Sequence, residues 1–155
     1  MAEASNRTEA GEAIVVRARQ WIGTPYRHQS SCRGAGADCL GLLRGLWREA
    51  LGEEPQEIPP YTADWAEFGG GEDLLAAARR HLLMVARPNA QGGDVLILRM
   101  KDEGVAKHVG ILAYSEAGHA TMIHAYSGYG VVESPLTPAW ARRIVEVFRF
   151  PEERS

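Results

Sequence analysis

Three side chains of this 155-residue chain have the types needed for nucleophilic catalysis by a thiol: Cys39, His108 and His124. A thiol attacks a carbonyl carbon as the thiolate, so it needs a base such as an imidazole close enough to take its proton. That imidazole in turn needs a third group that holds its orientation and tautomer. We therefore treat Cys39 as the candidate nucleophile, His108 as its base and His124 as the orienting residue.

Cys39 lies at the start of a predicted helix, because Asp38 is a good N-cap residue and Gly52 is a good helix terminator. The unpaired N–H groups and the peptide dipoles at a helix start favour a thiolate, and the same N–H groups could bind an oxyanion. The position is also compatible with a small buried core residue, as most free cysteines are.

The two histidines lie in short segments with strand character. Alternation places Val109 and Ile111 on the core-facing side of the first strand, so we expect His108 to point to the other side. If the two strands form a hairpin that turns at 115–118, positions 108 and 124 lie directly opposite each other. A register slip of one residue would move His124 to the wrong face, and each histidine alone is compatible with a polar surface residue.

A zinc site is the rival use of the same residue types, with Cys39, His108, His119 and His124 as the possible ligands. The chain has no CxxC, no HExxH and no other closely spaced ligand pair, so we expect no metal and no cofactor. Cys32 lies seven residues before Cys39. A disulfide between the two cysteines would disable the thiol, so we expect Cys32 to take no part in the chemistry.

The elements that position these residues indicate an α+β domain, since helices come first and an antiparallel sheet follows. Apolar residues at helical spacing predict helices over 8–22, 38–52 and about 72–84. Short β-rich segments predict strands over 94–100, 108–114, 121–126, 130–135 and 144–150. Thr137 and Pro138 predict a short helix before the last strand. We expect 24–37 to be a loop and about 53–92 to be an excursion over the surface.

Composition indicates one globular domain over 1–155, with 45% hydrophobic and 24% charged residues. A net charge of −3 argues against a nucleic-acid partner. No apolar run approaches the roughly 20 residues that a membrane span needs. The polar start lacks the pattern of a secretory leader, so we expect synthesis in the cytoplasm.

Five motifs in the order of one family resemble the NlpC-type cell-wall cysteine peptidases, which are bacterial relatives of papain. They are Trp21-Ile22-Gly23-Thr24-Pro25-Tyr26, Ala37-Asp38-Cys39-Leu40-Gly41-Leu42, Gly92-Gly93-Asp94-Val95, His108-Val109-Gly110-Ile111 and Ile123-His124-Ala125. The likeness runs from about residue 10 to residue 150. Tyr-Arg-His-Gln at 26–29 and Pro-Tyr-x-x-x-Trp at 60–65 resemble a phage-tail and gene-transfer-agent branch.

The resemblance implies a papain-like fold and the roles of nucleophile, base and third member for Cys39, His108 and His124. It implies that the Tyr26 hydroxyl helps the Cys39 backbone N–H stabilise the oxyanion. Asp38 matches an acidic residue that holds the substrate amine in some relatives, although an N-cap explains it equally well and one carboxylate could serve both. Leu40 stands where most relatives have serine, so any contact of that serine with substrate is absent here.

The implied substrate is the stem peptide of peptidoglycan, often cut between D-glutamate and a diamino acid. Two alternatives stay open: an amidase or acyltransferase with the same thioester chemistry, and a non-catalytic tail-tip subunit. Since the single domain has no room for a wall-binding module, we expect the tail or baseplate hub proteins of a phage-like particle to be its partners. The protein would then be incorporated in the tail of that particle.

Overall fold

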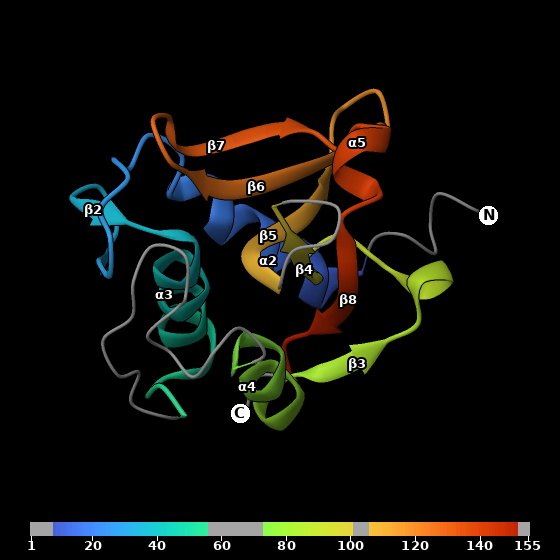
Figure 1. The fold of residues 1–155 in the computed structure, drawn as a ribbon, viewed down its shortest axis with the longest axis horizontal. Helices are drawn as coiled ribbons and strands as arrows, with labels where there is room; N and C mark the ends of the chain where they lie inside the picture. Colours follow the sequence, from blue (N-terminus) through green and yellow to red (C-terminus); the bar gives the residue numbers. More distant parts are fainter. Residues whose placement is uncertain (1–7, 56–72, 101–105, 152–155) are drawn as a thin grey trace.

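The computed structural model describes residues 8–55, 73–100 and 106–151. Six of the described strands form an antiparallel sheet in the order β3-β8-β4-β5-β6-β7, and helices pack against it (Figure 1). The expected α+β architecture is confirmed. The Pro-Tyr-x-x-x-Trp stretch at 60–65 and the predicted start of the third helix lie outside the described residues.

Two helices precede the sheet in sequence, and each begins after a capping residue, of which the sequence predicts Asp38. Helix α2 spans Glu9–Gln20, where the Thr8 hydroxyl accepts a hydrogen bond from the Gly11 N–H at 3.0 Å. Helix α3 spans Cys39–Leu51 and ends at Gly52, whose φ of 98° lies in the left-handed region that favours glycine. Cys39 is therefore the first residue of α3.

The strands of the main sheet fall where alternation predicts them. Their bounds are β4 Val95–Arg99, β5 Ala106–Tyr114, β6 Ala120–Tyr126, β7 Gly130–Pro135 and β8 Ile144–Arg149. Strand β4 is central and pairs with both β5 and β8. The short helix α5, Pro138–Ala141, begins after the Thr137 cap as predicted, and it connects β7 to β8.

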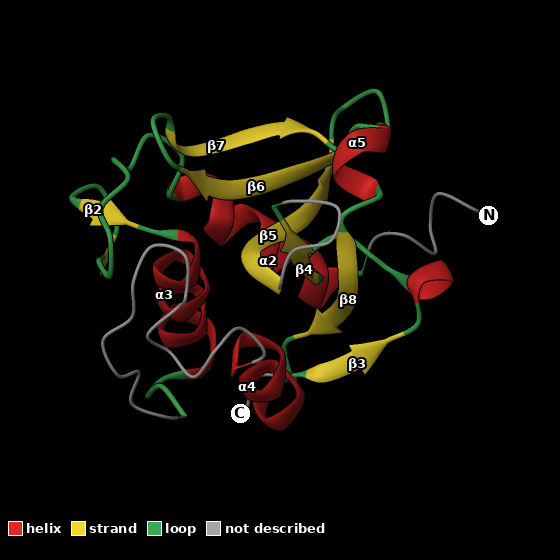
Figure 2. Ribbon diagram, viewed as in Figure 1, coloured by secondary structure: helices red, strands yellow, loops and turns green. Residues whose placement is uncertain are grey.

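Both faces of this sheet are buried, whereas the sequence indicates one core-facing side. On one face Val109, Ile111 and Ile123 pack with the buried residues of α2 and α3 in the main core. On the other face Leu112 and Met122 form a second core with Trp140 of α5. Figure 2 shows α3 and α5 well apart, on different sides of the strands. His108 belongs to a covered face, not to an open one.

The segment between α3 and β4 differs from the expected surface excursion. Helix α4 spans Asp73–His81, and its Leu74, Leu75 and Ala78 are buried in the main core. The predicted helix to residue 84 is wrong at its end, because β3, Leu83–Val85, pairs with β8 instead. Long-range strand pairing here overrides the local helical periodicity.

The expected loop 24–37 contains a small antiparallel pair, β1 Ser31–Cys32 and β2 Gly36–Ala37. A single-turn 3-10 helix, η1, spans Arg87–Asn89 before β4. Among the helices that the structure describes, none has the length and apolar composition needed to cross a membrane.

Candidate active site

Asp38 fixes the start of α3 and the loop that precedes it. One carboxylate oxygen accepts a hydrogen bond from the Gly41 N–H and the other accepts one from the Gln29 N–H, both at 2.7 Å. The side chain is buried, with 2% of Asp38 exposed. The N-cap interpretation of Asp38 is confirmed by these contacts, and its role toward a substrate amine stays a prediction.

The Cys39 thiol lies against the edge of β5. Its Sγ atom is 3.8 Å from the Lys107 carbonyl oxygen, and the Val109 N–H lies close enough to lower the pKa of the thiol. The thiol therefore contacts the backbone on both sides of His108, the proposed base. The residue is 7% exposed, and it is the first residue of a helix packed on the sheet.

An incomplete strand ladder makes this contact possible. Among the described residues, the pairing of β5 with β6 runs from Tyr114 opposite Ala120 to Ile111 opposite Ile123 and extends no further. Alternate residues of an antiparallel strand bond to alternate neighbours, and Leu112 bonds to β4, so the Val109 N–H faces β6. With the ladder ended, that N–H interacts with the Cys39 sulfur instead.

Burial, and to a smaller extent the nearby Asp38 carboxylate, raise the pKa of the Cys39 thiol to about 12. The N–H groups of Val109, Leu40 and Cys39 itself act in the opposite direction. The predicted effect of the helix start is therefore present, but desolvation outweighs it. At neutral pH the buried sulfur is therefore a neutral thiol, which would have to lose its proton to act as a nucleophile.

The two imidazoles of the candidate site are in direct contact. His108 Nε2 and His124 Nδ1 are 2.8 Å apart, and the rings meet edge to face with centroids 5.0 Å apart. Both residues are buried, with 5% of His108 and 1% of His124 exposed. The structure thus brings together the base and the orienting residue that the sequence proposes, while their catalytic roles stay predictions.

The predicted register of this hairpin is wrong by two residues. The register that pairs Ile111 with Ile123 puts Gly110 across from His124 just beyond the end of the ladder, and a Cβ added to Gly110 would lie 3.6 Å from the His124 Cβ. His108 and His124 are therefore diagonal neighbours, not directly opposite. Because the shift is even, His124 stays on the same face as His108.

Burial also keeps both imidazoles neutral. It lowers the pKa of His108 to about 3, with a smaller contribution from the nearby His124, and it lowers the pKa of His124 to about 4. At neutral pH the site therefore holds a thiol and two neutral imidazoles. His108 can act as a general base in that state, because its ring still has a lone pair.

Tyr26 is close enough to Cys39 and Asp38 to interact with their charges. It forms an isolated parallel bridge with Ala37, directly before Asp38. Burial, and to a smaller extent the negative charges of the Cys39 thiolate and Asp38, raise the pKa of the Tyr26 hydroxyl to about 12. Tyr26 is therefore a neutral hydroxyl close to the sulfur, as a hydrogen-bond donor for an oxyanion must be.

Trp140 and Ser134 are among the residues next to the histidines that the sequence analysis missed. The Trp140 ring stacks on His108 with centroids 5.7 Å apart and an interplanar angle of 25°. The Ser134 hydroxyl oxygen lies 2.9 Å from His124 Nε2. Alternation along 130–135 puts Ser134 and Val132 on one face, and that signal could have indicated Ser134.

The remaining candidates of the sequence lie apart from the imidazoles. Both cysteines are in the described part of the chain and both are free, so no disulfide links Cys32 to Cys39. Cys32 is exposed on β1. His119 lies in the turn between β5 and β6, where its carbonyl accepts a hydrogen bond from the Ser115 N–H.

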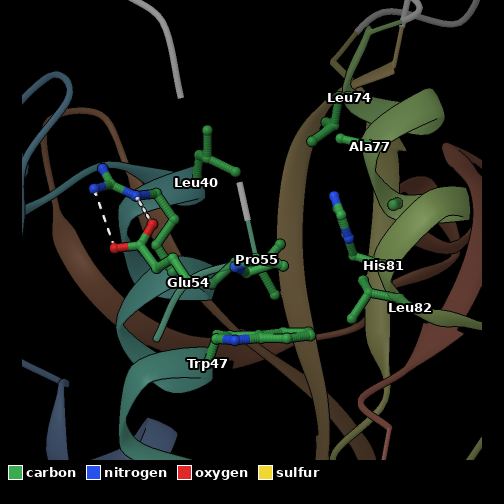
Figure 3. A pocket seen from close by; sticks show the side chains of 11 residues that line it. Leu40, Trp47, Glu54, Pro55, Leu74, Ala77, His81 and Leu82 are labelled. Carbon is green, nitrogen blue, oxygen red and sulfur yellow. Dashed lines mark hydrogen bonds and ion pairs between the residues drawn. The ribbon is translucent and has the colours of Figure 1, made fainter. Parts of the chain in front are cut away.

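Leu40 lines an apolar pocket between α3 and α4, together with Trp47, Leu74 and Leu82 (Figure 3). A second, open cleft of about 530 Å³ adjoins Tyr26 and is lined by Pro25, Tyr26 and the turn 127–130. Tyr26, a proposed catalytic residue, therefore borders an open space.

No protein-family model matches the sequence, and no curated protein matches it. Solved structures do share its fold. An NlpC/P60 family protein from Bacillus cereus aligns over 94% of this chain with a TM-score of 0.62 and 20% identity. NlpC1 from Trichomonas vaginalis aligns over 90% with a TM-score of 0.56 and 20% identity.

The chain spans less than half of those two proteins, 42% and 43% of their respective lengths. An N-acetylmuramoyl-L-alanine amidase from Bacteroides uniformis is covered over 100% of its length, with a TM-score of 0.54 and 13% identity. The α+β arrangement of helices on an antiparallel sheet is therefore that of NlpC/P60 proteins.

Proposed function

We propose that this chain is a cysteine hydrolase that cleaves amide bonds in the stem peptide of peptidoglycan, acting as an endopeptidase. The observation that carries the proposal is the Cys39 thiol at the start of α3, in contact with the backbone on both sides of His108. The imidazole pair of His108 and His124 supports it. The fold shared with NlpC/P60 proteins and the motif resemblance supply the substrate class.

In the proposed reaction the Cys39 sulfur attacks the amide carbon while its proton passes to His108. Since His108 Nε2 contacts His124, Nδ1 is the nitrogen that receives this proton. The Tyr26 hydroxyl and the Cys39 N–H stabilise the oxyanion. Protonated His108 then gives the proton to the leaving amine, and water hydrolyses the thioester to restore the thiol.

The second candidate function is a muramoyl-peptide amidase, which uses the same thiol chemistry at a different bond. The structural likeness to the Bacteroides uniformis amidase favours it, because that protein is matched over its whole length. The two functions leave different products. An endopeptidase creates a new amine between stem residues, whereas an amidase releases whole stem peptides from the glycan, and transfer to an acyl acceptor would indicate an acyltransferase.

Digestion of purified peptidoglycan tests the proposal, with the soluble products identified by mass spectrometry. The parent chain and a Cys32→Ala variant should release the same fragments, since Cys32 is exposed and we expect it to take no part in the chemistry. A Cys39→Ala variant should release none. If Cys39→Ala digests the wall as well as the parent does, the catalytic assignment is wrong; if none of the three releases fragments, a non-catalytic subunit is favoured.

We also propose that a phage-like tail or baseplate carries the protein to the wall. The support is the resemblance of the stretches at 26–29 and 60–65 to the phage-tail and gene-transfer-agent branch. Immunodetection of the protein in purified particles should place it in the tail fraction. Its presence only in the cytosol would contradict this carriage and would leave the hydrolase proposal intact.

A further inference from the structure

Polar side chains run in one row across three neighbouring strands on the face that carries the imidazoles. His108 on β5 contacts His124 on β6, and His124 Nε2 lies 2.9 Å from the Ser134 hydroxyl on β7. His124 pairs with Val132 in the β6–β7 ladder, so Ser134 is its diagonal neighbour on the same face. His124 is thereby engaged at both ring nitrogens and is 1% exposed.

The two contacts of His124 are coupled, because a neutral imidazole has one N–H and one lone pair. A hydroxyl can accept or donate, so two arrangements of protons fit the distances. In the first, His108 and His124 both have the proton on Nε2, and Ser134 accepts from His124. In the second, both rings have it on Nδ1, and Ser134 donates to His124.

Only the first arrangement leaves His108 able to act as a base toward Cys39. There, His108 Nε2–H donates to His124 Nδ1 and the lone pair of His108 lies on Nδ1, the nitrogen that receives the thiol proton. In the second arrangement that nitrogen already has a proton. We propose that Ser134 is a positioning residue, which accepts the His124 Nε2–H and so holds both imidazoles in the productive tautomer.

This inference rests on the proposed function, since His108 is a base only if Cys39 is a nucleophile. Loss of the hydroxyl would leave the His124 Nε2–H without this acceptor in a buried place, and the unproductive tautomer would become populated. One hydrogen bond contributes about 0.5–1.5 kcal/mol, which corresponds to a change of roughly two- to thirteenfold in the tautomer ratio. Thr at the same position keeps the hydroxyl, whereas Ala removes it.

The direct test is the tautomer of both histidines, measured by the ¹⁵N chemical shifts of the imidazole nitrogens in the parent and in Ser134→Ala. We expect Nε2–H on both rings of the parent. In Ser134→Ala the shifts should move toward the Nδ1–H form, and Ser134→Thr should restore the parent shifts. Nδ1–H on His124 of the parent would overturn the proposal, as would shifts that Ser134→Ala leaves unchanged.

The second test is the rate at which iodoacetamide alkylates Cys39 across a range of pH, in a Cys32→Ser background so that one thiol reports. Ser134→Ala should lower the rate near neutral pH, by up to about tenfold because the rate follows the fraction in the productive tautomer, and Ser134→Thr should recover it. Ser115→Ala is the matched control, because its hydroxyl accepts a hydrogen bond from the His119 N–H in the exposed turn of the β5–β6 hairpin. A purely structural role of Ser134 would lower stability and leave the pH profile unchanged.

Neither measurement requires peptidoglycan, so the two proposals can fail separately. If the wall is not digested but the tautomers and alkylation respond as expected, the proposed function is wrong and the role of Ser134 stands. If Cys39-dependent digestion occurs and Ser134→Ala matches the parent in tautomer and alkylation, the role of Ser134 is wrong.

Discussion

Replacing Asp38 by alanine should lower the stability of the fold and raise the reactivity of the neighbouring thiol. The carboxylate accepts two backbone hydrogen bonds, from Gly41 and Gln29, each at 2.7 Å, and it is 2% exposed. A charge-assisted hydrogen bond of this kind contributes about 1–2 kcal/mol. The free energy of unfolding should therefore fall by about 2–4 kcal/mol.

The same substitution changes the chemistry at Cys39 in a known direction. The Asp38 charge raises the pKa of the thiol, so its removal should lower that pKa. The thiolate fraction at a given pH should increase, and with it the alkylation rate. Stability should thus fall while thiol reactivity rises. A general loosening of the fold would also expose the thiol and speed its alkylation, so the pKa of the thiol itself must be measured.

Urea denaturation and the pH dependence of alkylation by iodoacetamide measure the two effects. Thr8→Ala is the matched control, because it removes a single cap bond at 3.0 Å at the exposed start of α2 and should cost about 0.5–1 kcal/mol. If Asp38→Ala costs no more than Thr8→Ala, the second hydrogen bond to Gln29 contributes nothing. If the thiol pKa rises, the electrostatic reasoning is wrong.

Two further perturbations follow from the buried face around the histidines. Gly110→Ala should cost about 1–3 kcal/mol in urea denaturation, because a Cβ there would lie 2.4 Å from the Met122 Cγ and Sδ atoms; Met122→Ala in the same chain should recover part of the loss, and an additive double variant would contradict the clash. Acid should also destabilise the fold, because the folded-state pKa values of His108 and His124, about 3 and about 4, lie below those of the unfolded chain. Stability is complete above a pH of about 6.5 and is lost as the pH falls toward 4, on the order of 3 kcal/mol for each ring, since the unfolded chain binds protons there that the folded chain does not. Urea midpoints across this pH range measure the loss, and His124→Gln should reduce the slope; a flat profile for the parent would contradict the neutral buried pair.

Sequence patterns predicted which elements carry the candidate catalytic residues. The Asp38 cap and the Gly52 terminator place Cys39 at the first position of α3, and strand alternation places both histidines on one face. These predictions depend on local geometry, which neighbouring residues determine. They held because a period of two is insensitive to an even shift in register.

Quantities that depend on long-range packing could not be predicted in the same way. The turn 115–119 sets the β5–β6 register, and its length differs from the expected one by an amount that alternation cannot detect. Leu83–Val85 forms the strand β3 and does not continue the helix, because it pairs with β8. The thiol pKa depends on how deeply Cys39 is buried, and no local pattern records that depth.

The early end of the β5–β6 pairing, at Ile111 opposite Ile123, sets the stability of the sheet against the position of the Cys39 thiol. Extending the ladder by one more hydrogen-bonded pair, Val109 with Ala125, would use the N–H that now interacts with the Cys39 sulfur. A more regular hairpin would therefore displace the nucleophile from its position. Substitutions that favour pairing of Val109 with Ala125 should stabilise the sheet and lower the reactivity of the Cys39 thiol. Variants designed to stabilise the sheet should therefore leave these two residues unpaired.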